Sequence, residues 1–309
     1  MATATTPNVR LAALPSAAGQ AGLRGALASE FTKLRSVRST YWTLGALFIV
    51  SVGLAVAITA GSAANFANNP GNKAGFDATQ VSLGAFFELG QLIIAVLGAM
   101  VITSEYSTGM VRTSLTAQPR RGVVYAAKAI VFTAVTLVIS FVTAFIAFFV
   151  GQAIYSSKGV SASLFHTVKI PANANVNCNP NSGCTATFSG TDVITASTVA
   201  TAIIGTALFV TIVALIAFGV GSILRHTAGA IATVIALLFI VPILEQTLPN
   251  DWRWDIMRFL PDAATRVISV TVGGDNPHLW SAWPQLGVTA LWAAVLVGIG
   301  AYLFRRRDA

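Results

Sequence analysis

Charged residues are scarce in this sequence. Only 10% of the 309 residues are Asp, Glu, Lys or Arg, whereas a typical soluble domain contains about 25%. Hydrophobic residues make up 55% of the chain. This balance excludes an ordinary soluble protein and is typical of a chain that lies in a membrane.

Sequence motifs for catalysis are also absent. The chain has no G-x-x-x-x-G-K-[ST] loop for nucleotide phosphates, no H-E-x-x-H and no G-x-S-x-G. The three histidines lie in separate segments, at His166, His226 and His278. We therefore predict no catalytic residue, no metal site and no cofactor in this chain, which is not expected to be an enzyme. The glycine pair Gly219 and Gly221 lies in a long apolar stretch and is interpreted as helix packing.

What the sequence does contain is six long stretches that are nearly free of charge. A helix needs about 20 apolar residues to cross a hydrocarbon layer of about 30 Å. The stretches cover residues 41–60, 81–103, 129–154, 195–224, 228–244 and 286–304. We predict an all-α membrane protein with six transmembrane helices, formed by residues 23–309, after a disordered cytoplasmic tail at residues 1–22.

The charges between these stretches are distributed unequally. Alternate connecting segments, with both termini, hold thirteen Lys and Arg residues against three carboxylates, whereas the opposite side holds six against six. The positive-inside rule places the basic side, and so both termini, in the cytoplasm of a cell-membrane protein. The net charge of +8 therefore reflects the orientation of the protein in the membrane. Nucleic-acid binding would require the basic residues to gather on a soluble module.

A basic amphipathic segment precedes the first apolar stretch. Its apolar residues recur at helical spacing: Leu23, Leu27, Phe31 and Leu34. Mostly off this stripe lie the basic residues Arg24, Lys33, Arg35 and Arg38. Such a helix is expected to lie in the inner interface, where it meets anionic headgroups. It either anchors the chain only or also contacts a cytoplasmic partner.

Both cysteines lie in one segment on the opposite side of the membrane. Cys178 and Cys184 are separated by Asn-Pro and Ser-Gly turn formers in CNPNSGC. In an oxidising compartment this loop can close a disulfide. Zinc would need two further ligands, which His166 alone does not supply. We predict the disulfide.

Two short helices are expected in the last external segment, residues 248–283. Asp251 and Asp262 are the candidate caps for these helices. Glu88 is the one ionisable residue well inside a predicted span. A carboxylate at that depth either faces a substrate path or reaches outward to the membrane boundary.

Three features occur together in this chain: the segment ASEFTKLRSVRSTYWTL, the segment EYSTGMVRTSLTAQPRR with Lys128 after it, and six predicted spans with an interfacial helical segment before the last. Together they resemble the ABC type-2 transporter permeases, the transmembrane half of ATP-driven exporters. The segment ASEFTKLRSVRSTYWTL is similar to the connecting helix in the form common among actinobacterial members. The segment EYSTGMVRTSLTAQPRR, with Lys128 after it, resembles the family's first cytoplasmic loop. Six spans with an interfacial helical segment before the last follow the same layout. The chain departs from longer members in having no fused ATPase and half of the usual twelve spans.

The resemblance implies specific roles for cytoplasmic residues. Residues 105–117 would form a coupling helix on the ATPase, with the Arg225–His226 turn as a smaller second contact. The coupling residues implied are Glu105, Gly109, Arg112, Leu115, Pro119, Arg120 and Arg121. Beside them the connecting helix would contribute Glu30, Lys33, Arg35 and Arg38. Two ATPase subunits, which bind ATP and Mg²⁺, would serve a homodimer or heterodimer of permeases.

The resemblance also implies a multidrug-type efflux function for an amphipathic or hydrophobic compound. By analogy the compound would pass between two permease copies, along spans two and five, with Phe86, Phe87 and Glu88 near the outer mouth. Two alternatives remain open from the residues themselves. One is an ATP-independent channel or carrier, which a repeated polar stripe through several spans would favour. The other is a non-transporting scaffold subunit, which needs no coupling loop.

Overall fold

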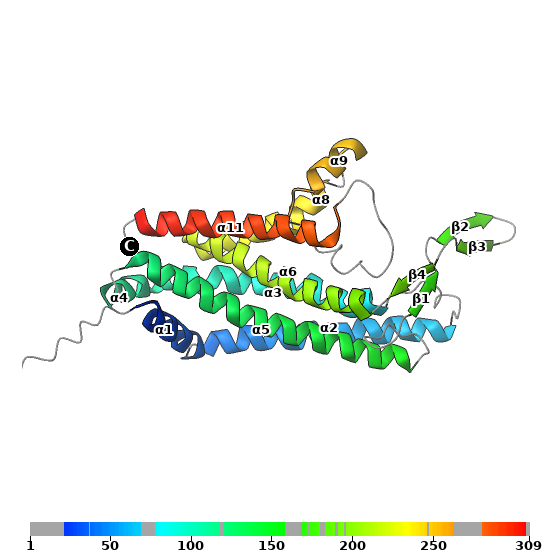
Figure 1. Ribbon diagram of the computed structural model, residues 1–309, viewed down its shortest axis with the longest axis horizontal. Coiled ribbons are helices and arrows are strands. Elements are labelled where there is room, and N and C mark those ends of the chain that lie inside the picture. Colours follow the sequence, from blue (N-terminus) through cyan, green and yellow to red (C-terminus); the bar gives the residue numbers. More distant parts are fainter. Residues whose placement is uncertain are drawn as a thin grey trace, which may run out of the picture.

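The computed structural model describes residues 22–36, 38–68, 78–117, 120–157, 168–171, 174–179, 183–188, 191–194, 196–245, 247–261 and 280–306. Six helical spans lie side by side in an elongated bundle (Figure 1). Each is long and apolar enough to cross a membrane. The prediction of an all-α membrane domain with six spans is confirmed.

The helices extend beyond the apolar stretches that predict them. Five spans are single helices, namely α2 (Arg38–Asn68), α3 (Ala78–Thr108), α5 (Arg121–Ser156), α6 (Ala196–Leu224) and α11 (Ala282–Arg306). Span five consists of α7 (Thr227–Ile235), the π-helical turn η2 (Ala236–Ile240) and α8 (Val241–Glu245). Hydropathy marks only the part of a helix that suits hydrocarbon, whereas the helix continues until the chain turns. The sequence therefore located the spans but underestimated their length.

The fourth span, α6, occupies the centre of the bundle. In its most apolar window 78% of residues are buried, compared with 17% in span five. It packs against α3, α5 and α11. A Cβ added at Gly219 would lie 2.8 Å from the Leu296 backbone of α11, and one at Gly221 would lie 2.9 Å from the Ala99 carbonyl oxygen of α3. Both glycines therefore permit close helix packing, as their positions predicted.

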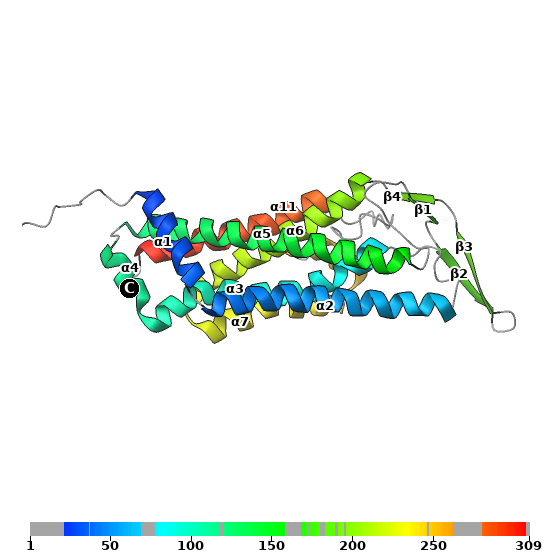
Figure 2. The same ribbon diagram turned by 90° about the horizontal axis from the view of Figure 1, so that it is seen from below.

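Two short helices lie at one end of the bundle, where α11 also ends. They are α1 (Leu23–Ser36) and α4 (Met110–Ala117) (Figure 2). Helix α1 crosses the bundle beside α5 and α2. The helix predicted before the first span is confirmed, but it ends at Ser36, and Arg38 is the first residue of α2. Of residues 1–22, predicted as a tail, only Gly22 is among the described residues.

The opposite end of the bundle carries two antiparallel ribbons. Strand β1 (Val168–Pro171) pairs with β4 (Thr191–Ile194), and β2 (Ala174–Asn179) pairs with β3 (Gly183–Phe188). The sequence predicted only a turn-rich loop here. Asn175, Asn177 and Asn179 lie within β2 although asparagine is more typical of turns, and the strands are too short to show a clear alternation. The ribbons are an addition to the all-α membrane domain.

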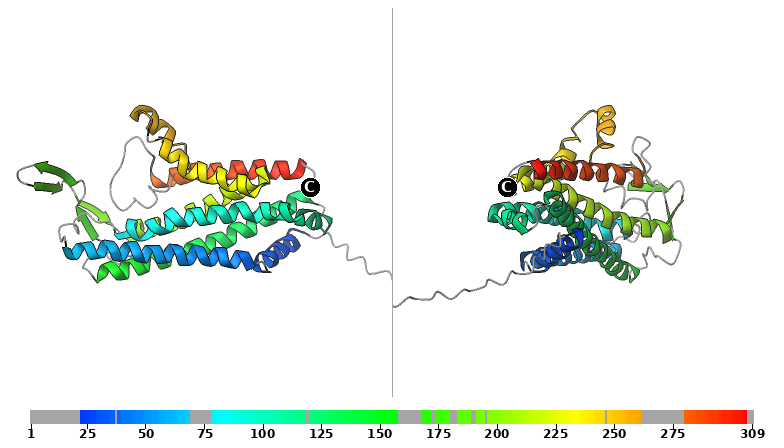
Figure 3. Two further views of the ribbon diagram at one scale, coloured as in Figure 1. Left: turned by 180° about the vertical axis from the view of Figure 1, so that it is seen from behind. Right: turned by 60° about the vertical axis from the view of Figure 1, so that its left-hand side comes forward.

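A further short helix, α9 (Asn250–Met257), projects sideways from the bundle next to α8 (Figures 1 and 3). It confirms one of the two short helices predicted before the last span. Its N-cap is Pro249, so Asp251 lies inside the helix and does not cap it. The chain after α9 is fastened to α11, because Gln285 Nε2 donates to the carbonyl of Arg258 at 3.2 Å. The helix predicted after Asp262 lies outside the described residues.

Candidate functional site

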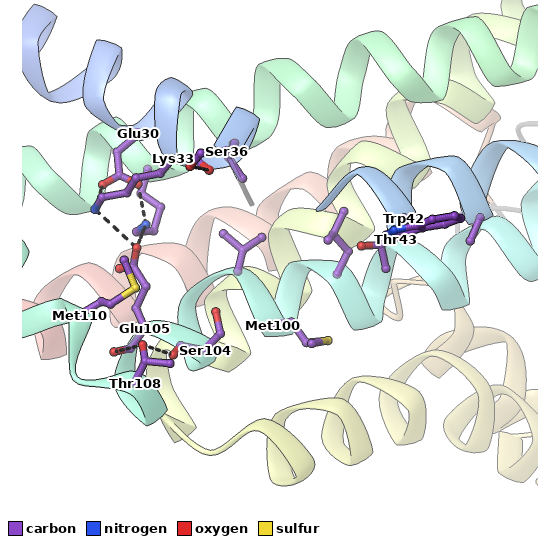
Figure 4. A pocket seen from close by; sticks show the side chains of 15 residues that line it. Glu30, Lys33, Ser36, Trp42, Thr43, Met100, Ser104, Glu105, Thr108 and Met110 are labelled. Atoms are coloured by element: carbon purple, nitrogen blue, oxygen red, sulfur yellow. Dashed lines mark hydrogen bonds and ion pairs between the residues drawn. The ribbon is translucent and has the colours of Figure 1, made fainter. Parts of the chain in front are cut away.

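Four charged side chains meet at the α1 end of the bundle (Figure 4). Lys128 Nζ of α5 lies 2.6 Å from Glu30 Oε2 of α1 and 2.6 Å from Glu105 Oε1 of α3. Lys33 Nζ of α1 lies 2.8 Å from Glu30 Oε1 and 3.6 Å from Glu105 Oε1. Each ammonium group therefore bridges two carboxylates that would otherwise repel each other. We call Glu30, Lys33, Glu105 and Lys128 the ion cluster.

The ion cluster is largely removed from water. The side chains of Glu30 and Lys128 are only 5% and 8% exposed. A charge buried without a partner costs several kcal/mol, so these residues are tolerated inside the protein because opposite charges surround them. Loss of any one member would leave its neighbours uncompensated. The cluster is thus a point where three helices depend on one another.

The surroundings of the ion cluster keep Glu30 and Lys33 charged. Burial raises the pKa of Glu30, but the charges and hydrogen bonds of Lys128 and Lys33 outweigh this effect and hold that pKa below its ordinary value. Burial lowers the pKa of Lys33, whereas Glu30 and Glu105 together raise it above its ordinary value. Both net shifts favour the ionised forms. The two residues on α1 are therefore charged at neutral pH.

The ion cluster also reaches the short helix α4. Lys33 Nζ donates to Ser114 Oγ at 2.9 Å, so one side chain of α1 contacts α3 and α4. The chain turns between α3 and α4 at Gly109, whose φ of 71° is left-handed. Glycine adopts this conformation without the clash that a Cβ would cause. The position of Gly109 thus sets the place where α4 folds back beside α1.

The helix predicted at residues 105–117 is shorter in the structure. Helix α3 continues to Thr108, because the chain does not turn before the left-handed Gly109, and α4 begins at Met110. Arg112 is exposed on α4, whereas Leu115 is partly buried against the hydrophobic core.

The remaining residues predicted for that loop and for the connecting helix are not members of the ion cluster. Arg120 is exposed at the start of α5 and Arg121 is partly buried in its first turn. Pro119 lies outside the described residues. Arg35 is exposed near the end of α1, and of Arg38 only the backbone is described. Among the predicted residues, the structure therefore brings Glu30, Lys33 and Glu105 together.

The turn between α6 and α7 approaches the same region. The guanidinium of Arg225 lies over the ring of Tyr106, 4.7 Å from its centroid, one residue after Glu105. Arg225 has a left-handed φ of 56°. His226 follows as the N-cap of α7 and accepts the N–H of Gly229 at 3.2 Å. The predicted second contact therefore lies beside the end of α3.

An open cavity of about 680 Å³ adjoins the ion cluster between α1, α2, α3 and α4 (Figure 4). We call it the inner cavity. The ion cluster lies at one end of it, whereas the rest of its wall is mostly apolar. The apolar lining residues are Leu34, Trp42, Ala46, Leu97, Met100, Val101 and Met110.

The three residues predicted near an outer substrate path occupy two environments. Phe86 and Phe87 are 0% and 4% exposed, and the Phe87 ring stacks on Phe209 of α6 with centroids 4.9 Å apart. Both rings therefore pack inside the helical bundle of this chain. Glu88, in contrast, is exposed on α3. The path itself stays a prediction.

The two cysteines are opposite each other in the β2–β3 ribbon. The register pairs Cys178 with Cys184, while their side chains lie outside the described residues. Directly opposed residues of an antiparallel pair have Cβ atoms about 4.5–5.5 Å apart, close to the separation that a disulfide requires. The predicted bond suits this register and stays a prediction.

Lys128 is the member of the ion cluster for which the sequence analysis predicts no role. In the sequence it is one of the basic residues on the cytoplasmic side and follows the EYSTGMVRTSLTAQPRR segment. One signal was available: the basic side holds three carboxylates, of which Glu30 and Glu105 are two. A lysine at the end of a span must find an acidic partner if it is buried.

Among the described residues, no group of three or more His, Cys, Asp or Glu residues could hold a metal.

Comparison with known proteins identifies the family. Residues 26–177 match the model of the ABC-2 family transporter proteins. This region contains the whole ion cluster and the residues that line the inner cavity. No curated protein matches the sequence. The chain belongs to the ABC-2 type transporter membrane family, as a multi-pass permease of an ABC transporter.

Proposed function

We propose that this permease exports an amphipathic or hydrophobic compound across the cell membrane, driven by ATP hydrolysis on a separate subunit. Two permease copies would work with two ATPase subunits, which bind ATP and Mg²⁺. The absence of a nucleotide-binding motif from the sequence supports a separate ATPase. The observation that carries the proposal is the ion cluster, which connects the exposed helix α4 and the end of α3 to α1 and α5.

Helix α4 has the two faces that a docking helix needs. Val111 is buried and Leu115 is partly buried, so one face is held against the bundle. The exposed face presents Arg112, Thr113 and Thr116. A partner that pushes on this face displaces a helix already anchored to the membrane domain.

The contacts of α4 and α3 then pass that displacement to two other helices. Movement of Ser114 acts on α1 through Lys33, and movement of Glu105 acts on α5 through Lys128. Packed helices respond to such a load by small rigid-body shifts, which is a common way to link a subunit motion to a membrane domain. The four residues would therefore transmit the ATPase cycle.

The distribution of charge supports a cytoplasmic location for this end. Helices α1 and α4 lie at the end of the bundle where α11 finishes with Arg305 and Arg306 (Figure 1). By the positive-inside rule a basic end faces the cytoplasm, where the ATPase would be.

The described spans support an ATP-independent channel less well than they support an ATP-driven exporter. Their buried hydroxyl groups mostly donate to carbonyls of their own helix, as Thr103 does to Ala99 at 2.9 Å and Thr206 to Ala202 at 2.7 Å. Hydroxyls satisfied in this way do not form a continuous polar path. A scaffold subunit, in turn, would have no need of a buried ion cluster behind an exposed helix.

The experiment is to purify the permease with its ATPase, reconstitute the complex in liposomes and measure ATP hydrolysis with and without transported compound. Arg112→Glu reverses a charge on the exposed face of α4 and should reduce complex formation and stimulated hydrolysis. Arg24→Glu makes the same change on the exposed part of α1 and should leave both unchanged. Both variants should insert normally in the membrane, and normal coupled turnover by Arg112→Glu would refute the docking role of α4.

A further inference from the structure

We propose that the inner cavity is a binding site for an uncharged, largely apolar molecule that arrives from the inner leaflet. The inference deepens the proposed function, on which it rests, because it names a loading site and a class of substrate. Its volume of about 680 Å³ falls within the range of about 300–1,000 Å³ that is usual for small-molecule sites. In the inner cavity, the apolar wall meets the ion cluster.

The wall of the inner cavity suits an apolar body. Ala46 of α2 and Leu97, Met100 and Val101 of α3 line it, with Met110 of α4 at the end near the ion cluster. Methionine side chains are flexible and polarisable, so they adapt to ligands of different shape. A small side chain at Ala46 leaves the space open. This combination favours shape-tolerant binding of an apolar molecule.

The charges at the end of the inner cavity select against ionised ligands. The cluster contains two carboxylates and two ammonium groups, and every one of them is within ion-pair distance of an opposite charge. A charged ligand would have to displace one member from a largely buried pair, which leaves another charge uncompensated. An uncharged ligand has no such cost. Its polar group can bond instead to the hydroxyls of Ser104 and Thr108, which also line the cavity.

The position of the inner cavity gives access from the membrane. It lies between amphipathic α1 and the first turns of α2, where Trp42 is 80% exposed and Tyr41 is also exposed. Exposed aromatic residues of this kind collect where headgroups meet hydrocarbon. A molecule dissolved in the inner leaflet therefore reaches the cavity without crossing the cytoplasm.

The test uses purified full-length permease alone, in phosphatidylcholine nanodiscs, and benzophenone as an uncharged photoreactive probe. Benzophenone inserts preferentially at methionine, so the labelled residues should be Met100 and Met110, as located by peptide mass spectrometry. If the probe binds in the inner cavity, the extent of labelling should saturate as the probe concentration rises. Two matched probes, 4-benzoylbenzoate and a trimethylammonium benzophenone, carry opposite charges. Both should label these residues weakly.

Ala46→Phe fills the inner cavity and should lower the labelling of Met100 and Met110 about tenfold. Ala57→Phe is the matched control, because it places the same side chain on an exposed position of α2 three turns farther along. If Ala46→Phe does not fold, Ala46→Leu fills the space more gently and should give a smaller decrease. The inference would be overturned if all three probes label equally or if labelling does not saturate. It would also be overturned if neither Ala46→Phe nor Ala46→Leu reduces the labelling.

This assay contains neither ATP nor the ATPase, so its result is separate from that of the coupling experiment. Saturable labelling together with normal turnover by Arg112→Glu would support the cavity and reject the docking role of α4. Reduced turnover by Arg112→Glu without saturable labelling would reject the cavity and leave the docking role standing.

Discussion

Lys128 Nζ lies 2.6 Å from a carboxylate oxygen of Glu30 and 2.6 Å from one of Glu105. One ammonium group of α5 thus joins α1, which lies across the bundle, to the end of α3. These three residues are far apart in the sequence, and no local pattern relates them. The arrangement makes Lys128 the residue on which the attachment of α1 depends most.

Lys128→Met should therefore destabilise the protein by about 3–5 kcal/mol, because two largely buried carboxylates would lose the nearer of the two ammonium groups that they share. The change is measured as a lower midpoint of thermal unfolding in detergent. The triple variant Glu30→Gln, Glu105→Gln, Lys128→Met removes both carboxylates together with this lysine, so that only the partly exposed Lys33 stays charged, and it should recover part of the loss. If Lys128→Met alone unfolds at the same temperature as the unaltered protein, the ion cluster is not a structural link.

The attachment of α1 should depend on pH only at the extremes. The pKa of Glu30 is lowered in the folded protein, so its contribution is complete above the ordinary carboxyl pKa and is lost as pH falls through the lowered value. The pKa of Lys33 is raised, so its contribution is complete below the ordinary lysine pKa and is lost as pH rises through the raised value. Between about pH 5 and about pH 9, α1 should remain attached.

Spin labels at Ser29→Cys and Thr113→Cys, both exposed, report the distance between α1 and α4 in a background without Cys178 and Cys184. The distance distribution should stay narrow across this range and broaden in strong acid. Glu30→Gln should remove most of the acid-dependent change. Broadening that begins near neutral pH would contradict the assignment.

Phe87 and Glu88 are adjacent in the sequence but should respond differently to substitution. Phe87→Ala removes a buried ring stacked on Phe209 and should cost about 3–5 kcal/mol of stability. Glu88→Gln changes an exposed residue and should leave the unfolding temperature unchanged. Thermal unfolding of the two variants distinguishes core packing from surface position.

Transport by Glu88→Gln tests the predicted outer path. If Glu88 faces that path, loss of its charge should weaken transport of cationic compounds more than that of neutral ones. Proteoliposomes that hold equal amounts of the two proteins provide the comparison. Equal transport of both classes by the variant would show that this carboxylate has no part in the path.

The cysteines of the β2–β3 ribbon should form a disulfide in protein isolated from its membrane. The intact mass should rise by about two hydrogens on reduction, and no alkylation should occur before it. The loop is short, so in the chain-entropy account removal of the bond should cost less than the roughly 3 kcal/mol expected for a 15-residue loop. Two thiols that alkylate freely in the native protein would disprove the bond.

The membrane layout was accessible from the sequence because the length of an apolar stretch and the side of a positive charge are read directly from residue order. The contact between Glu30 and Lys128 could not be predicted from the sequence, because it joins positions 98 residues apart and depends on how α1 crosses α5. The end of α3 was also misplaced. The helix expected at residues 105–117 is interrupted, because the left-handed conformation of Gly109 determines where the chain turns.

The π-helical turn at Ala236–Ile240 changes the direction in which the outer part of span five faces. A turn of this kind holds an additional residue, so α8 is rotated by roughly 100° about the span axis relative to an uninterrupted continuation of α7. Ile243 and Leu244 are exposed after this rotation. Helix α9 projects sideways from the bundle next to α8, and deletion of one residue from η2 should turn α8, and α9 with it, by a similar angle about the span axis.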